Sequence, residues 1–398
     1  MVKMSNSTKN SATILAVGTE LTTGQITNRN AAWISEKLVN LGAEVTLHET
    51  VPDDREIILR ALDHCLAHST LIFVTGGLGP TSDDFTRNVL ADWAGKELVF
   101  HEPSWKQIET RLAKFNIPVA ASNRQQCFFP KGSEVLLNSE GTANGFSFEH
   151  REAKVWVLPG PPREIEAIWN SGIDEQVRRR IPDAKPLELL TWQCLGKSES
   201  ELGEITERAL EGSGLKTGYR AHRPFVEVKV WCERHLVSEK TPFFEKLEQA
   251  IKPWIATKGG EDLVDRLFSL TLGGDEIEII DSASGGILTE RLGQFLRNPK
   301  NHAVAKSVTV ATEFDGVEKP LDWMQDLLKD ADPESLTLAI AGFSAEGQFT
   351  LGFRHAEKSH CETLTSPWKG REMLDRTQRF CTETALKRWS EWLKESIH

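Results

Sequence analysis

The sequence predicts an α/β protein whose first 180 residues form a mostly parallel sheet covered by helices. Short apolar runs alternate there with longer segments of helical periodicity, which is typical of strands joined by crossover helices. Residues 70–74 have the character of a buried strand and are followed directly by a glycine-rich turn. The 398 residues, 39% hydrophobic and 26% charged, suffice for two or three globular domains.

Each element of this first segment has a local signal. Gly42 stands just beyond the first helix, Asp53 or Asp54 precedes the second, and Pro162 opens the last. Short β-branched and apolar runs predict strands at 13–17, 44–51, 70–74 and 155–158. Helical periodicity predicts helices at about 30–41, 54–68, 86–94, 103–115 and 163–170.

Two further domains are predicted beyond the basic run at 178–180, which we interpret as a solvated helix end. The smaller, α+β domain has strands at 187–194 and 225–232 and helices at 200–210 and 241–256. The last domain is α/β. It has strands at 276–281, 307–312, 336–341 and 349–353, a helix at 285–296 and a closing helix through Trp389 and Trp392.

Composition narrows the function classes. A formal net charge of −11 argues against broad nucleic-acid binding, and no apolar run approaches the roughly 20 residues of a membrane span. The polar start of the chain has no apolar core of a signal peptide, so a cytoplasmic location is expected. The six cysteines are widely spaced, which favours neither zinc nor disulfides. Small molecules or other proteins are therefore the expected partners.

The turn at 76–84 has the composition of a phosphate and metal site. Gly76, Gly77 and Gly79 allow positive φ, so that successive N–H groups can face one concavity and bind anionic oxygens. Asp83 and Asp84 are hard oxygen ligands suited to Mg²⁺, and we expect only one of two adjacent carboxylates to bind the ion. The alternative is a tight turn in which Asp83 or Asp84 caps the next helix.

A second polar loop follows the first strand, and the carboxyl ends of parallel strands share one edge of the sheet. Glu20 places a carboxylate there, and Gln25, Asn28 and Asn30 supply amides that can bind ribose or phosphate. Each could instead be a cap or turn residue, which is the interpretation we favour for Asn28.

Five motifs in this order resemble the CinA family (competence/damage-inducible protein), whose first domain is of the molybdopterin-binding, MogA/MoaB-like type. They are Gly18-Thr19-Glu20-Leu21 with Gly24-Gln25-Ile26, Asn28 and Asn30; Thr75-Gly76-Gly77-Leu78-Gly79-Pro80-Thr81 with Asp83, Asp84 and Thr86; Asn123-Arg124 with Gln126; Gly141-Thr142-Ala143 with Gly145-Phe146; and Leu158-Pro159-Gly160-Pro161-Pro162 with Glu164. Gln125 replaces a usual basic residue and Asn144 a usual proline, and residues 196–202 are similar to the family's KH-like linker.

The resemblance implies a three-layer molybdopterin-binding-like domain at 1–180, a KH-like linker domain at 181–257 and a divergent deamidase-like domain at 258–398. It also implies a homodimer and metal-dependent hydrolysis of ADP-ribose, or a related nucleotide, to AMP and ribose 5-phosphate. One divalent ion (Mg²⁺, Mn²⁺ or Co²⁺) is expected on the catalytic residues Asp83, Asp84 and Glu20. The expected substrate-binding residues are Gly18, Thr19, Gln25, Asn28, Asn30, Gly76, Gly77, Gly79, Pro80, Thr81, Asn123, Arg124, Gly141, Thr142, Gly160, Pro161, Pro162 and Glu164. The alternative is a non-catalytic nucleotide- or molybdopterin-binding protein with a scaffold C-terminal domain.

The last domain keeps only part of the family's amidase pattern. Ser282 stands at the nucleophile position, and Gly285 and Gly286 could supply oxyanion N–H groups. The family's Tyr-Ser-Asn segment is missing, the loop at 339–344 has changed, and Lys306 or Lys319 could serve as a base only through the fold. We therefore expect nicotinamide mononucleotide deamidase activity to be lost and Ser282 to be a capping serine.

Overall fold

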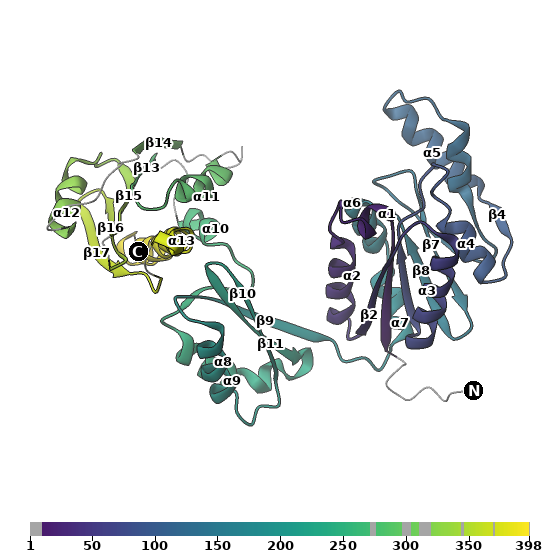
Figure 1. Ribbon diagram of the computed structural model, residues 1–398, viewed down its shortest axis with the longest axis horizontal. Helices are drawn as coiled ribbons and strands as arrows, with labels where there is room; N and C mark the ends of the chain where they lie inside the picture. Colours follow the sequence, from purple (N-terminus) through teal and green to yellow (C-terminus); the bar gives the residue numbers. More distant parts are fainter. Residues whose placement is uncertain are drawn as a thin grey trace. The chain divides into compact units, whose positions relative to one another are not determined.

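The computed structural model describes residues 10–270, 276–296, 304–309, 320–343, 346–368 and 371–397 (Figure 1). The chain divides into two compact units, Met1–Glu188 and Leu189–His398. The second unit carries two separate sheets. The proposed domain boundaries after residues 180 and 257 stay a prediction.

The first unit is built on a six-stranded sheet in the order β2-β1-β3-β8-β7-β6. Four neighbouring strands run parallel: β2 (Glu44–Val51), β1 (Ser11–Val17), β3 (Leu71–Thr75) and β8 (Ala153–Leu158). The antiparallel edge consists of β7 (Gly145–His150) and β6 (Glu134–Leu136). All residues of β1 and β3 are buried.

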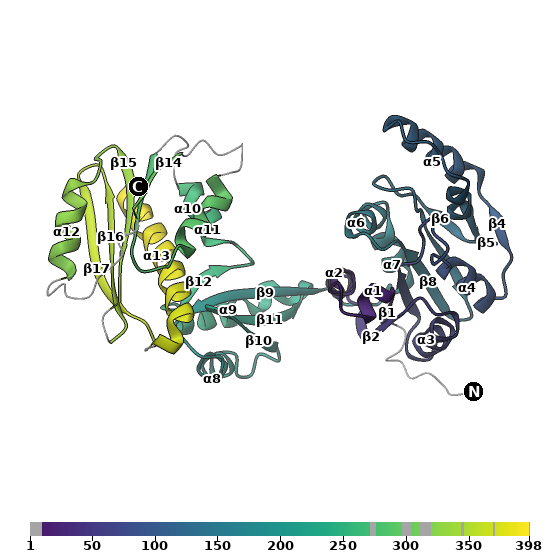
Figure 2. The ribbon, with the colours of Figure 1, turned by 45° about the horizontal axis from the view of Figure 1, so that its top comes forward.

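Helices cover both faces of this sheet, which confirms the predicted three layers (Figures 1 and 2). Alternate residues of β1 point to opposite faces, so Ile14 and Leu15 belong to different hydrophobic cores. One core is covered by α2 (Arg29–Asn40), α6 (Pro162–Asn170) and α7 (Ile173–Arg180), and the other by α3 (Arg55–His68) and α4 (Thr86–Trp93).

Further elements complete the unit, and of these only the helix at 103–115 was predicted. A one-turn helix, α1 (Thr19–Thr22), follows β1, and α5 (Glu102–Lys114) lies between the paired strands β4 (Leu98–Phe100) and β5 (Phe128–Pro130). A 3₁₀ segment, η2 (Ala121–Cys127), leads from α5 toward β5.

The smaller sheet of the second unit has the order β10-β11-β9-β12. Its strands are β9 (Leu187–Leu195), β10 (Lys216–His222), β11 (Phe225–Glu233) and β12 (Ile255–Lys258), and α8 (Glu199–Ala209) and α9 (Val237–Ile251) pack against them. The predicted helix at 241–256 was wrong at its end, because α9 stops at Ile251 and β12 begins at Ile255. Pro253 explains this end, because proline has no N–H with which to continue the helical hydrogen bonds.

The larger sheet has the order β14-β13-β15-β16-β17. It comprises β13 (Glu276–Asp281), β14 (Val304–Thr309), β15 (Ser335–Ala341), β16 (Gln348–His355) and β17 (Lys358–Thr365). A hydrophobic core joins it to α10 (Leu263–Leu270), α11 (Ile287–Leu296) and α13 (Leu374–Ile397), and α12 (Pro320–Asp330) packs against a separate cluster. The strand predicted at 307–312 begins at 304, and positions 310–312 lie outside the described residues. None of the described helices combines the length and apolar character that crossing a bilayer requires.

Candidate functional site

The predicted site lies where the parallel strands of the first unit end. In the strand order, β1 stands between β2 and β3, so the chain passes from β1 to β2 on one side and then crosses to β3 on the other. In open α/β sheets this switch point is where ligands bind, at the carboxyl ends of the strands. The loops after β1, β3 and β8 all reach this edge.

The glycine loop after β3 packs too closely for any side chain at two positions. Gly76 has φ 99° and Gly77 has φ 66°. A Cβ on Gly76 would collide with the carbonyl oxygen of Val17, and one on Gly77 with the hydroxyl of Thr86. The predicted positive φ is thus confirmed at Gly76 and Gly77, whereas Gly79 does not have it. At Gly79 a Cβ would instead collide with the carboxylate of Asp84.

Side chains from outside the loop hold its carbonyl groups. Arg87 donates from Nη2 to the Leu78 carbonyl (2.8 Å) and from Nη1 to the Gln125 carbonyl (2.9 Å). Gln125 donates in turn to the carbonyls of Gly79 (3.2 Å) and Thr81 (2.8 Å). Gln125, where the family usually has a basic residue, therefore orients the loop.

The opposite side of these peptide groups remains available. Within the described part of the chain, the N–H groups of Gly77, Leu78 and Gly79 have no hydrogen-bond partner. Consecutive unpaired N–H groups in such a loop form a concavity for anions. The loop can therefore bind phosphate oxygens through its backbone.

The two aspartates after the loop have different roles. Asp84 accepts hydrogen bonds from the N–H (3.0 Å) and the hydroxyl of Thr81, and so closes the turn. Asp83 is exposed, and the neighbouring Thr81 side chain lowers the pKa of its carboxyl group, which keeps it ionised. The alternative that either residue caps the next helix was wrong, because Phe85 is the N-cap of α4 and no side chain caps it.

The loop after β1 is tied to a residue that the sequence did not single out for the site. Asp53 accepts from the N–H (2.7 Å) and the hydroxyl (2.9 Å) of Thr19, whereas Asp54 caps α3. A Cβ on Gly18 would lie 2.7 Å from Oε1 of Glu20, whose side chain folds back over this glycine. Two adjacent aspartates follow β2, and the N-cap of α3 needs only one of them. The second aspartate was the signal from which a role for Asp53 could have been inferred.

The amide side chains of the first loop also have different roles. Asn28 caps α2 by accepting from the N–H of Ala31 (3.1 Å), which confirms the favoured interpretation. Asn30 instead reaches across the sheet edge and donates to the Gly160 carbonyl (2.7 Å). Asn30 therefore links the loops after β1 and β8, and Gln25 is exposed.

The remaining predicted binding residues are mostly engaged by protein groups. Asn138 donates to Glu164 (2.6 Å), and burial raises the pKa of the Glu164 carboxyl group. Gly141 lies against that carboxylate, and Thr142 accepts from Gln126 (3.2 Å). These contacts make Glu164 a support for the loop at 138–142.

Three residues in and beside the central motifs are also fixed. Asn123 accepts from the N–H of Ala120 (3.0 Å), and the guanidinium of Arg124 lies 4.3 Å from the ring centroid of Phe100. Asn144 is buried and donates to Ser104 (2.9 Å) and Gln107 (2.8 Å). Asn144 therefore ties its loop to α5.

The carboxylates of this site can hold a divalent ion only when a bound ligand supplies further oxygen atoms. Among the residues that the structure describes, no three His, Cys, Asp or Glu side chains gather as a metal site. Mg²⁺ needs no such cage, since one or two carboxylates with substrate phosphates and water suffice. The exposed, ionised Asp83 fits this role. The Thr86 hydroxyl, buried beneath Gly77, has no hydrogen-bond partner among the residues that the structure describes.

In the second unit, Ser282 is held by two backbone groups. Its hydroxyl donates to the Ile340 carbonyl (3.3 Å) and accepts from the N–H of Gly342 (3.1 Å). The capping role expected for Ser282 was wrong, because the hydroxyl of Ser284 accepts from Leu288 (3.0 Å) at the start of α11. Gly285 and Gly286 both have positive φ. The side chain of Lys306, and residues Lys319 and Ser344, lie outside the described residues.

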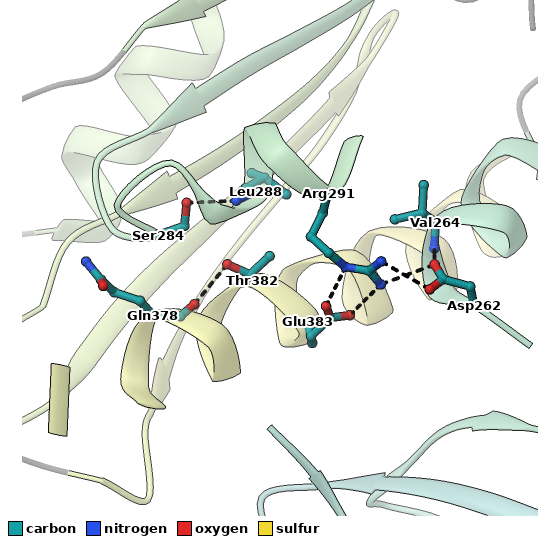
Figure 3. A network of polar contacts seen from close by, with 8 residues as sticks. All are labelled: Asp262, Val264, Ser284, Leu288, Arg291, Gln378, Thr382 and Glu383. Atoms are coloured by element: carbon teal, nitrogen blue, oxygen red, sulfur yellow. Dashed lines mark hydrogen bonds and ion pairs between the residues drawn. The ribbon is translucent and has the colours of Figure 1, made fainter. Parts of the chain in front are cut away.

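Beside this turn, a polar network joins α11 to α13 (Figure 3). Arg291 pairs with Glu383 (Nε to Oε1, 2.7 Å) and with Asp262 (Nη1 to Oδ2, 3.1 Å). Glu383 is nearly buried, and burial raises the pKa of its carboxyl group while Arg291 opposes that shift. The network therefore holds α11, which follows the turn, against α13.

Comparison with known proteins gives a consistent set of matches. Residues 13–179 match the sequence family described as "Probable molybdopterin binding domain". A competence-damage inducible protein of Clostridium novyi (strain NT) is 34% identical over 287 residues, covering 71% of this chain and 69% of that protein. Its counterpart in Clostridium botulinum (strain Kyoto / Type A2) is 34% identical over 291 residues, covering 71% and 70%.

Solved structures match the first unit. The protein CinA from Thermoplasma acidophilum is 29% identical with a TM-score of 0.40, covering 43% of this chain and 99% of that one. The tungsten cofactor synthesizing protein MoaB from Pyrococcus furiosus is 17% identical with a TM-score of 0.31, covering 44% and 96%.

Proposed function

Because the chain belongs to the CinA family of competence-damage inducible proteins, we propose that its first unit is a metal-dependent hydrolase. The proposed reaction is cleavage of the pyrophosphate of ADP-ribose, or a related nucleotide, to AMP and ribose 5-phosphate. The observation that carries the proposal is the row of unpaired N–H groups at Gly77, Leu78 and Gly79 in the described part of the chain, which the exposed Asp83 follows in the sequence.

Each part of the loop has a task in this reaction. The three N–H groups hold phosphate oxygens while negative charge develops on them. Asp83, with Glu20 as a second carboxylate, would hold the divalent ion. When bound, that ion polarises a phosphoryl oxygen and lowers the pKa of water. A water oxygen would form the new bond to phosphorus while the bond from phosphorus to the bridging oxygen breaks. The leaving phosphate would keep the bridging oxygen, and the proton of the water would pass to solvent.

A second candidate is a non-catalytic nucleotide- or molybdopterin-binding protein. It is supported by the engagement of Asn30, Asp84 and Glu164 with other protein groups, which gives these side chains a structural role. Both candidates use the same loop, because unpaired N–H groups bind a phosphate whether or not it is cleaved.

The two candidates differ in one measurement. The purified full chain is incubated with ADP-ribose and Mg²⁺, Mn²⁺ or Co²⁺, and AMP is quantified, with chelator as control. Metal-dependent AMP release is the result we expect. Calorimetric binding of ADP-ribose without AMP release in any metal supports the binding protein. We also propose that the protein is a homodimer, which light scattering on the same sample tests.

A further inference from the structure

We propose that a cavity in the second unit, lined by Trp254 and Lys387, binds a small organic anion that carries an aromatic ring. The cavity has a volume of about 390 Å³. Ligand pockets of proteins fall at roughly 300–1,000 Å³, so a compact ring with one anionic group fits this space. The cavity does not involve the glycine loop, and the inference is independent of the function proposed above.

The walls come from segments that are distant in sequence. One wall is a single face of α13, where Phe380, Thr384 and Lys387 follow at helical spacing. The facing walls are Leu195 at the end of β9, Trp254 just before β12, and the segment that follows β17. Figure 2 shows α13 running close to these strands of the smaller sheet. The cavity is therefore built by tertiary structure and could not be found from any one motif.

Charge is the feature that points to an anion. The lining residues include the cations Lys387 and Arg388 but no Asp or Glu, although the chain as a whole carries a net charge of −11. Arg388 is half-exposed at the rim and pairs with Glu362 (3.4 Å) and Glu391 (3.5 Å). Lys387 is the deeper cation, because its side chain is only 12% exposed.

Lys387 is incompletely compensated where it lies. Its ammonium donates to the Pro253 carbonyl (3.0 Å), and the Glu391 carboxylate lies at 3.9 Å, beyond hydrogen-bond distance. Burial lowers the pKa of Lys387, whereas Glu391 opposes that shift. An ammonium has three donors, and a buried cation is costly unless it is paired. An anionic group in the cavity would supply the missing partner.

The remaining lining residues of the cavity favour a ligand with an aromatic ring. Trp254 and Phe380 present aromatic surface, and Leu195 and Leu364 add apolar surface. Aromatic side chains favour stacked or edge-on contacts with another ring. The hydroxyl of Thr384 is buried and has no hydrogen-bond partner in the described part of the chain. A polar substituent on the ligand could satisfy it.

The test is isothermal titration calorimetry of the full chain with phenyl phosphate and with benzoate, which distinguish the two kinds of anion. Phenol is the neutral control. We expect Lys387→Gln to weaken binding of the preferred anion at least about tenfold, because a charge-assisted hydrogen bond is lost. Lys394→Gln, on the same helix but outside the cavity lining, should bind as wild type does.

A blocking variant and an activity control complete the design. Thr365 is exposed and lines the cavity, so Thr365→Trp should abolish binding while both units still melt as in the wild type. Lys387→Gln should leave metal-dependent hydrolysis unchanged, and Asp83→Asn should leave phenyl phosphate or benzoate binding unchanged. The proposal is overturned if the wild type binds neither anion, if phenol binds equally well, or if Lys387→Gln and Lys394→Gln behave alike.

Discussion

Arg87 shows how a single residue can organise the loop of the first unit from below. Its side chain is 1% exposed, and burial lowers the pKa of its guanidinium to about 10, although Asp84 opposes that shift. Two of its N–H groups serve backbone carbonyls of different segments. A cation buried at this depth costs free energy, which its hydrogen bonds to the loops must offset. We therefore treat Arg87 as a positioning residue.

Replacing Arg87 should destabilise the first unit. Arg87→Met removes the guanidinium donor from the Leu78 and Gln125 carbonyls, and we expect a loss of about 2–4 kcal/mol in the free energy of unfolding. Arg55→Met is the matched control, because Arg55 pairs with Asp92 at the surface (2.7 Å) and exposed pairs contribute about 0–1 kcal/mol. Differential scanning calorimetry of both variants measures the difference. Equal losses would show that Arg87 does not hold the loop.

The adjacent aspartates should respond differently to substitution. Asp83→Ala removes the proposed metal ligand, so metal-dependent hydrolysis should fall at least about 100-fold with an unchanged melting temperature. Asp84→Ala unties Thr81 and should lower the melting temperature and raise KM. Initial rates and thermal melts distinguish the two. Wild-type turnover in both variants would remove the metal assignment.

At the scale of elements, a helix or strand could be predicted from the sequence when it was long and had a clear cap or turn at its end. The bounds of β2, α3 and α8 agree with expectation to within one or two residues, because each combines a long pattern with a cap or turn. The strands β4, β5 and β6 have three residues each, too few for any period to show. Edge strand β10 was missed because most of its residues are not buried.

The site was predictable where the chemistry is local to the chain. The glycines after β3 predict an anion-binding backbone loop by their residue type alone. The side chains that hold this loop, Arg87 and Gln125, could not be predicted, because tertiary packing brings them to it. Asp53 reaches the loop after β1 in the same way. The same limit explains Glu164, whose neighbours come from the loop at 138–142.

The glycine loop itself gives a sharp test of close packing. Gly76→Ala and Gly95→Ala share the strain of positive φ, which costs about 1–2 kcal/mol. A Cβ on Gly95 meets open space, whereas one on Gly76 collides with the Val17 carbonyl. Gly76→Ala should therefore lose roughly 1–3 kcal/mol more and abolish nucleotide binding. Urea unfolding and calorimetry measure both quantities, and indistinguishable variants would contradict the geometry.

The turn after β13 should be structural and not catalytic. Both hydrogen-bonding capacities of the Ser282 hydroxyl are used by backbone groups, and a serine is a weak nucleophile without a base in reach. Incubation with nicotinamide mononucleotide should release no ammonia, and Ser282→Ala and Ser284→Ala should both lower stability. Ammonia release that disappears in Ser282→Ala would show that the deamidase has been retained.

At the scale of the whole molecule, the first unit contains every residue of the proposed hydrolase site. The predicted boundary after residue 180 and the unit boundary after Glu188 differ by one short segment. Within that segment, Ile181 is 3% exposed and packs in the core beside Val177. The backbone of Lys185 packs against Gly42, and a Cβ added to Gly42 would lie 2.8 Å from it. The segment therefore completes the fold of the first unit.

Two truncated chains test this reasoning. A chain ending at Glu188 should fold and bind ADP-ribose as the full chain does, because the sheet edge and its loops are all present. A chain ending at Arg180 lacks the buried Ile181 and should be less stable by about 2–4 kcal/mol, comparable to deleting a core side chain. Thermal melts and calorimetry compare the two. A folded chain ending at Glu188 that binds no ADP-ribose would mean that the second unit contributes to the site, because the loop amides alone would then not suffice.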